Sequence, residues 1–289
     1  MIARLHSRLR AHAPAHTRAR ARSVAYKIQT GAILQGTPTL GAANVYFTSN
    51  SGNLYCAVIA SGASVWTVSL GAISHSAPTI DAGETTLFVG AANAVASAHY
   101  AASGAVKWTA TFSGAIYTSV LLNDVETQAF VACNDHRIYA LDATSGALLW
   151  YWTGTHDIYS SPLFVAASGA VVFGAHDGVV RALDANANGA VLWSYTTAGA
   201  VYAAPLLSLA LASIFVGSGD GHLYKLDASS GSVQFDFNSG GFIESQAAMS
   251  GDGAFIVVRL RGRWRECGRW RECGRWRERG RWRERTRRR

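Results

Sequence analysis

The sequence predicts an all-β protein, a β-propeller of about six four-stranded blades in which the closing blade is incomplete. Aromatic anchors recur with spacings of 42, 42, 43 and 42 residues, at Trp66, Trp108, Trp150, Trp193 and Phe235. Glycines keep the same spacing, at Gly62, Gly104, Gly146, Gly189 and Gly231. Each repeat contains short β-branched and aromatic runs separated by Gly, Asp, Asn and Ser. Four strands in forty-odd residues, repeated in series, are typical of a propeller.

A second periodic mark confirms the register of the repeat. Twelve residues after each anchor lies the expected start of a strand, at Pro38, Pro78, Val120, Pro162, Pro205 and Ala247. Counting back from Pro38 gives Tyr26 as a sixth anchor near the N-terminus. The constant distance predicts a fixed geometric step between neighbouring units, while differences in length fall in exposed turns.

The unit from Pro162 to Trp193 shows how each repeat divides into strands. Four runs of strand-forming residues are expected, at 163–165, 170–174, 179–183 and 191–195. Asp177-Gly178 lies between the second and third runs, where glycine allows the positive φ of a tight hairpin. The unit therefore predicts an antiparallel four-stranded sheet.

The turn before the fourth strand has the most regular sequence, and Tyr139–Trp150 is its best copy. Asp142 is expected to accept backbone N–H bonds across the turn, and Gly146 to adopt a left-handed conformation. Trp150 then offers a large flat surface for packing between adjacent blades. Asp184 and Asp227 repeat this arrangement, whereas Val58 and Tyr100 replace the aspartate in the two earlier copies.

The pattern Ala-x-Asp-x-x-Ser-Gly-x-x-x-Trp resembles the tryptophan-docking motif of the pyrroloquinoline quinone (PQQ)-like repeat family. Residues 140–150 match it best, with Ser145 where the family usually has Thr. Residues 182–193 match with one insertion, and residues 225–235 carry Phe235 in place of Trp. The resemblance covers about residues 24–258 and implies a propeller fold, but it specifies little about function.

Ring closure is the least regular part of the pattern. Five units are complete, whereas the sixth offers only strands at 243–248 and 254–258. The N-terminal run 24–29 is the right type to complete that blade from outside and to remove exposed edges. Its missing third strand would fall at about 261–268, which lacks an apolar face. We therefore predict six blades with a defective closing blade; the alternative is an arc truncated from a larger ring.

Charge divides the chain into three parts: a basic leader at 1–22, the propeller at 23–258 and a low-complexity tail at 259–289. The leader carries six Arg and no acid, and the tail carries fifteen Arg and four Glu. The propeller holds five Lys or Arg against fourteen Asp or Glu, so it is acidic although the whole chain has a net charge of +8.

The tail repeats Gly-Arg-Trp-Arg-Glu-Cys/Arg four times from residue 262 to residue 285. One hypothesis is nucleic-acid binding, in which Arg contacts phosphate and Trp stacks on bases. The favoured interpretation is a disordered tail, or a repetitive DNA tract that is translated in the reading frame of the protein. We expect nucleic acid to bind only weakly, and only through this tail.

Residues 1–22 lack the apolar core of a secretory signal, and no stretch approaches the length of a membrane span. We therefore expect a cytoplasmic protein that is not secreted, with organelle targeting by the Arg-rich leader as the alternative.

Candidate reactive residues point to no catalytic, cofactor or metal site. Cys56 and Cys133 are expected to be small core residues, and no Cys-x-x-Cys spacing indicates a zinc site or disulfide framework. His136, His176 and His222 fall near successive turns, where a surface role is expected. Asp135, Asp177 and Asp220 share one turn position and are interpreted as turn-forming residues. Gly217–Gly221 is followed by a strand, so it lacks the helix N-terminus of a phosphate site.

The family resemblance raises PQQ as a cofactor. This tricarboxylate needs cationic, bidentate partners, and its dehydrogenases add a calcium ion. The expected innermost strands, around Thr37, Ser76, Thr118, Ser160, Ala203 and Ser245, contain no Lys or Arg, and Glu244 is the only adjacent acid. We therefore predict no cofactor and no enzymatic activity.

Residues 242–258 resemble a repeat in the C-terminal propeller of the β-alanine-activating enzyme family, which is acyl-CoA-synthetase-like. The adenylating and carrier domains of that family have no counterpart in this sequence. The resemblance implies a non-catalytic binding or scaffold module for a protein partner. The alternatives are a fragment of a PQQ-dependent oxidoreductase and, less favoured, an outer-membrane assembly lipoprotein of the same repeat family, because no signal or lipid-attachment cysteine is seen.

Overall fold

The computed structural model describes residues 26–250, 255–260 and 263–269, which form six antiparallel sheets. Five sheets have four strands and one has three. In chain order we call them blades one to six. Within the described residues, no helix is long and apolar enough to cross a membrane.

The strands follow each other blade by blade. Blade one contains β1 (Thr39–Leu40), β2 (Asn44–Thr48), β3 (Asn53–Val58) and β4 (Ser64–Ser69), and blade two contains β5 (Thr79–Ile80), β6 (Thr86–Ala91), β7 (Val95–Tyr100) and β8 (Val106–Thr111). Blade three contains β9 (Leu121–Leu122), β10 (Gln128–Cys133), β11 (Arg137–Asp142) and β12 (Leu148–Thr153), and blade four contains β13 (Leu163–Val165), β14 (Ala170–Gly174), β15 (Val179–Asp184) and β16 (Ala190–Thr196). Blade five contains β17 (Leu206–Ser208), the short 3₁₀ helix η1 (Leu209–Leu211), β18 (Ser213–Gly217), β19 (His222–Asp227) and β20 (Val233–Asn238), and blade six contains β21 (Ala248–Met249), β22 (Phe255–Leu260) and β23 (Arg263–Arg269).

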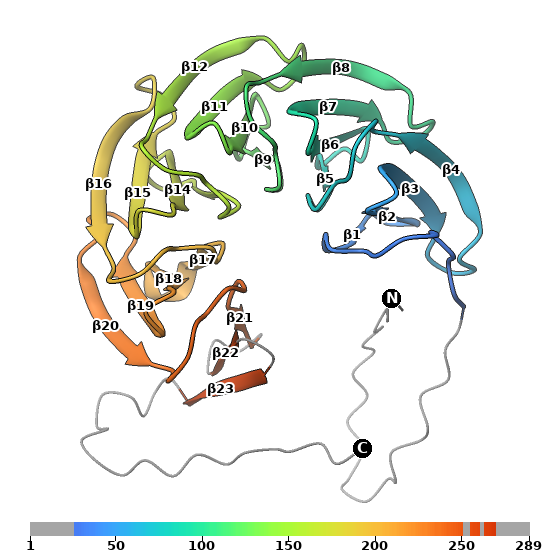
Figure 1. The fold of residues 1–289 in the computed structure, drawn as a ribbon. Helices are drawn as coiled ribbons and strands as arrows, with labels where there is room; N and C mark the ends of the chain where they lie inside the picture. Colours follow the sequence, from blue (N-terminus) through green and yellow to red (C-terminus); the bar gives the residue numbers. More distant parts are fainter. Residues whose placement is uncertain (1–25, 251–254, 261–262, 270–289) are drawn as a thin grey trace, which may run out of the picture.

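The blades stand around a central space, with the first strand of each blade innermost and the long fourth strands β4, β8, β12, β16 and β20 on the rim (Figure 1). This arrangement confirms the predicted propeller. The strand bounds in blade four differ from the predicted ones by no more than one residue at each end. Local turn chemistry and the apolar runs therefore determine the strands of each repeat.

The anchors Trp66, Trp108, Trp150 and Trp193 each dock on the glycine of the next blade. A Cβ on Gly189 would lie 2.7 Å from Cζ3 of Trp150, and one on Gly146 would lie 2.6 Å from the Trp108 ring. Both glycines have positive φ, 73° and 74°, so they fill two needs that only glycine meets well. The indoles of Trp66, Trp108 and Trp150 donate their N–H to a carbonyl of the same turn, as in Trp150 Nε1 to Ala185 O at 3.1 Å. The buried Nε1 of Trp193 has no hydrogen-bond partner among the described residues. This pairing confirms the predicted packing of Trp between blades.

A β-bulge accompanies every docking step. The ladder between the third and fourth strands shifts register immediately after the residue paired with the anchor, as between Ala140 and Leu141 opposite Trp150. The same shift occurs at the equivalent position of blades one, two, four and five. Bulges bend a strand and re-aim its side chains. Here the bulge lies beside the anchor, whose side chain packs on the next blade.

The turn aspartates act as expected. Asp142 Oδ1 accepts from the backbone N–H groups of Thr144 and Ser145 at 3.1 and 2.8 Å, and from the Ser145 hydroxyl at 2.8 Å. The Ser145 hydroxyl and these N–H groups lower the pKa of Asp142. Where Tyr100 replaces the aspartate, the backbone bond from Gly104 N to Tyr100 O remains at 2.8 Å, so the turn forms without the carboxylate.

The hydrophobic core consists of layers between neighbouring blades. One layer packs Phe130, Ile138 and Trp150 of blade three against Phe173 and Leu183 of blade four, and all five side chains are buried. Similar layers join blades one and two, two and three, four and five, and five and six. Cys56 and Cys133 lie inside these layers, which confirms the prediction that they are small core residues.

Among the described residues the closing blade has three strands, which agrees with the predicted incomplete blade. The low-complexity segment supplies its third strand, β23, which pairs antiparallel with β22. Strand β22 itself continues to Leu260, two residues past the boundary expected at 258. Residues 26–29 were expected to complete blade six, but they form no strand, and no ladder of the described residues joins them to β22 or β23. Residues 24 and 25 of that run lie outside the described residues.

Tyr26 instead occupies the docking position on blade one. Its ring lies against Gly62, and its hydroxyl donates to Ile59 O at 2.6 Å. Ile59 and Gly62 of blade one correspond to Ala185 and Gly189 of blade four. The N-terminal segment thus docks as the anchor of a preceding blade would, while remaining unpaired with the strands of blade six.

Docking predicts a clear ranking of substitutions. Trp150→Ala should lower the free energy of unfolding by ~3–5 kcal/mol, because the Trp150 side chain is buried and only 8% exposed. Asp142→Ala should cost ~1–2 kcal/mol because the turn keeps its backbone bond. Leu149→Ala, on an exposed position of the same strand, is the control and should change stability by under ~0.5 kcal/mol. Urea unfolding tests the ranking, and a Trp150→Ala effect as small as that of Leu149→Ala would contradict it.

The role of β23 can be measured with two truncated chains. A chain ending at Arg269 retains the ladder between β22 and β23, whereas one ending at Val258 removes β23 and the end of β22. We expect a lower melting temperature for the shorter chain. Ile256 and Val258 are buried in the last core layer, and in the shorter chain their strand β22 loses its neighbour β23. Both chains lack residues 270–289, so the comparison reports on β23 together with the last two residues of β22. Equal melting temperatures would show that β23 adds nothing to the propeller.

Buried His99 predicts a pH-dependent stability. Its Nε2 lies 2.8 Å from Ser97 Oγ, and its Nδ1 lies 2.9 Å from Gly104 O, which only accepts. Burial lowers the pKa of this imidazole, although the Gly104 bond opposes the shift. As the pH falls below the ordinary His value of ~6.5, the unfolded chain takes up the proton first and stability decreases.

The matching substitution is His99→Leu, because leucine stands at this position in the next three blades, at Leu141, Leu183 and Leu226. Melting temperatures measured from pH 7.5 to pH 5 should fall less steeply in the variant than in the native chain. Parallel curves would exclude His99 as a source of the pH dependence.

Candidate functional site

The segments that lead from the fourth strand of one blade to the first strand of the next lie between the two blades. In the segment from β8 to β9, Ile116 N donates to Ala91 O of blade two at 3.2 Å. In the same segment, Ala115 O accepts from Asn134 N of blade three at 3.0 Å. The segment from β16 to β17 is held by the equivalent two bonds, from Val201 N and to Ala200 O. Both neighbours therefore fix these two segments, and the segments from β4 to β5 and from β12 to β13 hold equivalent places in their repeats.

These fixed segments bring together one ring from each of four successive repeats. The ring centroids of His75 and Tyr117 lie 5.1 Å apart, those of Tyr117 and Tyr159 6.0 Å, and those of Tyr159 and Tyr202 6.0 Å. Each residue stands four positions before the first residue of an inner strand, β5, β9, β13 or β17. All four side chains are half-buried, so part of each ring faces solvent. We call His75, Tyr117, Tyr159 and Tyr202 the aromatic arc.

Two further rings extend the aromatic arc. His176, from the turn between β14 and β15, lies 5.3 Å from Tyr159 and meets Tyr202 edge-on at 4.5 Å. Phe242 lies 5.4 Å from Tyr202 on the side toward blade six. His176 thus packs into the arc, beyond the simple surface role expected from the sequence. The Nε2 atom of His176 is buried and has no hydrogen-bond partner in the described structure.

Acceptor oxygens surround Tyr159 at the centre of the arc. Its hydroxyl donates to Asp157 Oδ2 at 3.3 Å, and a side-chain hydrogen bond joins it to Asn134. Burial, followed by the charge of Asp157, raises the pKa of Tyr159. The Oδ1 atoms of Asn134 and Asp135 are buried and lack a donor among the described residues. His136 Nδ1 lies 3.0 Å from Asp157 Oδ1.

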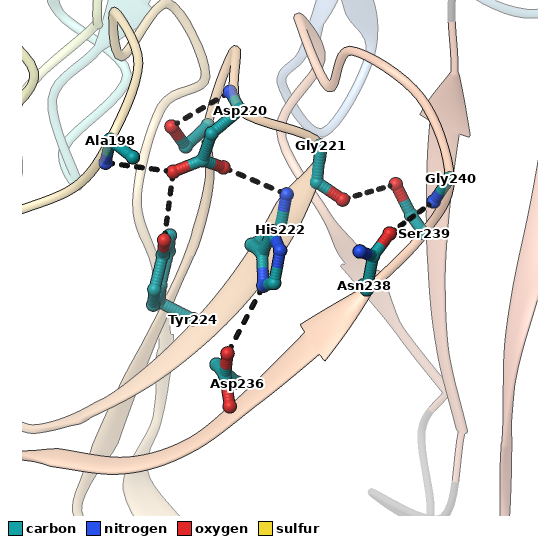
Figure 2. A network of polar contacts seen from close by, with 10 residues as sticks. Ala198, Asp220, Gly221, His222, Tyr224, Asp236, Asn238, Ser239 and Gly240 are labelled. Carbon is teal, nitrogen blue, oxygen red and sulfur yellow. Dashed lines mark hydrogen bonds and ion pairs between the residues drawn. The ribbon is translucent and has the colours of Figure 1, made fainter.

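The carboxylates at the shared turn position are structural, as interpreted from the sequence. Asp177 accepts from Val179 N at 3.0 Å and binds Arg181 through both oxygens. Asp220 forms the network in Figure 2: Oδ1 accepts from His222 N at 2.8 Å, and Oδ2 accepts from Ala198 N at 2.9 Å and the Tyr224 hydroxyl at 2.7 Å.

Burial opposes the charge of Asp220, but these donors outweigh it, and its pKa is lowered. Ala198 belongs to the segment that leads out of blade four, so the carboxylate also fastens one blade to the next. Beside it, His222 Nδ1 lies 3.1 Å from Asp236 Oδ2 on the surface (Figure 2). Asp220 is thus fully engaged in holding backbone and Tyr224, and is not poised for proton transfer.

The inner strands offer no fit for PQQ. Ser76, Thr118 and Ser160 are buried, and their hydroxyls donate to the backbone oxygens of Ala77, Ala132 and Ala203. The inner strands β1, β5, β9, β13, β17 and β21 contain no Lys or Arg to bind three carboxylates. Small hydroxyl side chains at this radius instead join neighbouring blades, as when Ala77 N donates to Ser119 Oγ at 3.1 Å.

Other candidate chemistry is also absorbed by the fold. Burial raises the pKa of Cys56 to about 11 and that of Cys133 to about 12, so both thiols stay protonated. Gly217 ends β18, and the following turn leads directly into β19, as expected, without a helix N-terminus. In the part of the chain that the structure describes, no three His, Cys, Asp or Glu residues are grouped to hold a metal ion. The arrangement is suited to recognising a ligand by stacking and hydrogen bonding.

Comparison with known proteins identifies the repeat. Residues 60–206 and 176–263 match the model of the family described as outer membrane protein assembly factor BamB, which together is more than half of the chain. The chain belongs to this family. A crystal structure of BamB from Moraxella catarrhalis is similar, with a TM-score of 0.64 and 21% identity over 81% of this chain and 73% of that chain. At this identity the likeness to BamB shows the fold alone. Among curated proteins, the comparison finds no match.

Sequence reasoning predicted the inner strands but missed the aromatic arc beside them. Its members recur at spacings of 42, 42 and 43 residues, immediately before the small residues Ser76, Thr118, Ser160 and Ala203. That recurrence was a usable indication of a shared role. The distance between repeats at this radius cannot be read from the sequence, so the sequence could not show that the rings meet.

Proposed function

We propose that this chain is a non-catalytic binding or scaffold module that recognises a protein partner. The observation that carries the proposal is the aromatic arc, which joins four successive repeats into one continuous, half-buried recognition surface. The BamB family description, which names an assembly factor, supports a role in binding proteins. Asp142, Asp177 and Asp220 are held in turns, and the Cys56 and Cys133 thiols are buried, which also favours binding over catalysis.

A finer proposal concerns the system in which the module acts. The resemblance of residues 242–258 to the propeller of the β-alanine-activating enzyme family supports a role beside an acyl-activating enzyme. The alternative is a fragment of a PQQ-dependent oxidoreductase, for which the inner strands lack cationic partners. We propose the cytoplasm as its compartment, with an organelle as the alternative because residues 1–22 carry six Arg and no acid.

Two measurements test these functions. In the first, the full-length chain is immobilised and cross-linked in a lysate of cells from its source organism. It should retain a defined protein in stoichiometric amount, and the heat-unfolded chain should not. An acyl-adenylating or carrier protein in that fraction would support the finer proposal. Addition of PQQ and Ca²⁺ should produce neither cofactor absorbance nor dye-linked alcohol oxidation. Either signal would replace the binding function with the oxidoreductase.

A further inference from the structure

The chemistry around the aromatic arc defines the class of ligand. We infer that the arc binds a cationic peptide segment, with an Arg or Lys side chain placed against the rings of Tyr117, Tyr159 and Tyr202. The inference rests on the proposed binding function and adds the chemical nature of the partner. Three features of the propeller support the inference: the rings, the buried acceptors beside them and the net charge.

The rings provide electron-rich faces. Three tyrosines in successive repeats, 6.0 Å apart from centroid to centroid, leave part of each ring open to solvent. A guanidinium or ammonium group is attracted to such a face, and the attraction strengthens where water is partly excluded. The contacts recorded for these three rings are with other aromatic rings, Asp157 and Asn134, and none is with Lys or Arg.

The same structure uses this contact elsewhere. The guanidinium of Arg181 lies 5.2 Å from the Trp152 ring centroid, and that of Arg137 lies 4.9 Å from the Tyr151 ring centroid. Both pairs lie on third and fourth strands, away from the inner segments that carry the arc. Within the described residues, the arc therefore presents the same kind of ring without a cationic partner.

Buried acceptors beside the rings favour a cation. Asn134, which is bonded to the Tyr159 hydroxyl, has a buried Oδ1 without a donor, and Oδ1 of the adjacent residue Asp135 is in the same state. Because both oxygens are buried, they act on a ligand through their negative potential and not through direct contact. That potential attracts an Arg or Lys side chain and repels an anionic ligand.

Charge points to the same ligand. Residues 23–258 hold fourteen acids against five Lys or Arg, so the field of the propeller attracts cations. Asp157 accepts a hydrogen bond from the Tyr159 hydroxyl. Exposed Glu244 stands at the position equivalent to the arc residues in the next repeat. Rings, acceptors and charge thus favour one class of partner over a neutral sugar or an anionic quinone.

The test uses a fluorescein-labelled peptide of alternating Gly and Arg, with binding to the full-length chain followed by fluorescence anisotropy at physiological salt. The matched probe replaces Arg with citrulline, which keeps the shape and removes the charge. We expect the Arg peptide to bind at least tenfold more tightly than the citrulline peptide. Equal binding of both peptides, or displacement of the Arg peptide by neutral maltoheptaose, would overturn the inference.

Substitutions locate the site. Tyr159→Leu and Tyr202→Leu should each weaken binding about tenfold, while Tyr159→Phe, which keeps the ring, should weaken it about twofold or less. Tyr100→Leu is the control, because Tyr100 is 49% exposed at the end of β7, away from the arc. Unchanged affinity in both leucine variants would place the peptide elsewhere and contradict the inference.

A benzophenone in the peptide provides a readout that does not depend on variant folding. Cross-links to the segments that carry Tyr117, Tyr159 or Tyr202 support the site, and cross-links confined to the outer strands refute it. The partner from the lysate experiment separates the two proposals. If arc variants retain that partner as well as the native chain does, the arc assignment fails and the binding function stands. If the native chain retains no partner, the binding function itself fails.

Discussion

The structure depends on the packing of an aromatic ring on the glycine of the next blade. The glycine has to lack a Cβ to admit the ring, and it has to accept positive φ to form the turn. In three of the four tryptophan contacts the indole N–H also donates to a carbonyl of that turn, as in the bond from Trp108 to Ala143 O at 3.0 Å. Because this contact joins only neighbours, the propeller is assembled from nearly equivalent pairwise steps, much as repeat proteins are.

Docking also explains the constant distance between each anchor and the next inner strand. The anchor belongs to one blade and rests on the next, and the segment that follows it is hydrogen-bonded to both blades. An inserted residue would break one of these bonds or shift the inner strand. Extra residues are tolerated instead in the turn before the anchor, where blade four has one more residue than blade three. The regular inner segments then bring the members of the aromatic arc within contact of each other.

The two ends of the ring show how the same contact behaves without a complete repeat. Tyr26 packs on Gly62 of blade one and donates to Ile59 O although it belongs to no described strand. The docking contact therefore needs only a ring and a hydrogen-bond donor. The third strand of blade six is β23, built from a segment of repeated Arg, Trp and Glu. Backbone pairing accepts such a sequence because each ladder bond is made by main-chain groups. In the part of the chain that the structure describes, blade six has three strands, β21, β22 and β23.

The sequence by itself determined the repeat, the strands and the docking motif, because these rest on local requirements: positive φ at glycine, an acceptor at Asp142 and apolar alternation. It also indicated that Cys56 and the shared turn aspartates have structural roles. Only the tertiary structure decided that His75, Tyr117, Tyr159 and Tyr202 meet, since the distance between repeats depends on the radius of the ring. It also decided that the low-complexity segment forms a strand and that Tyr26 docks without strand pairing, since both depend on which edges and surfaces the folded chain leaves available.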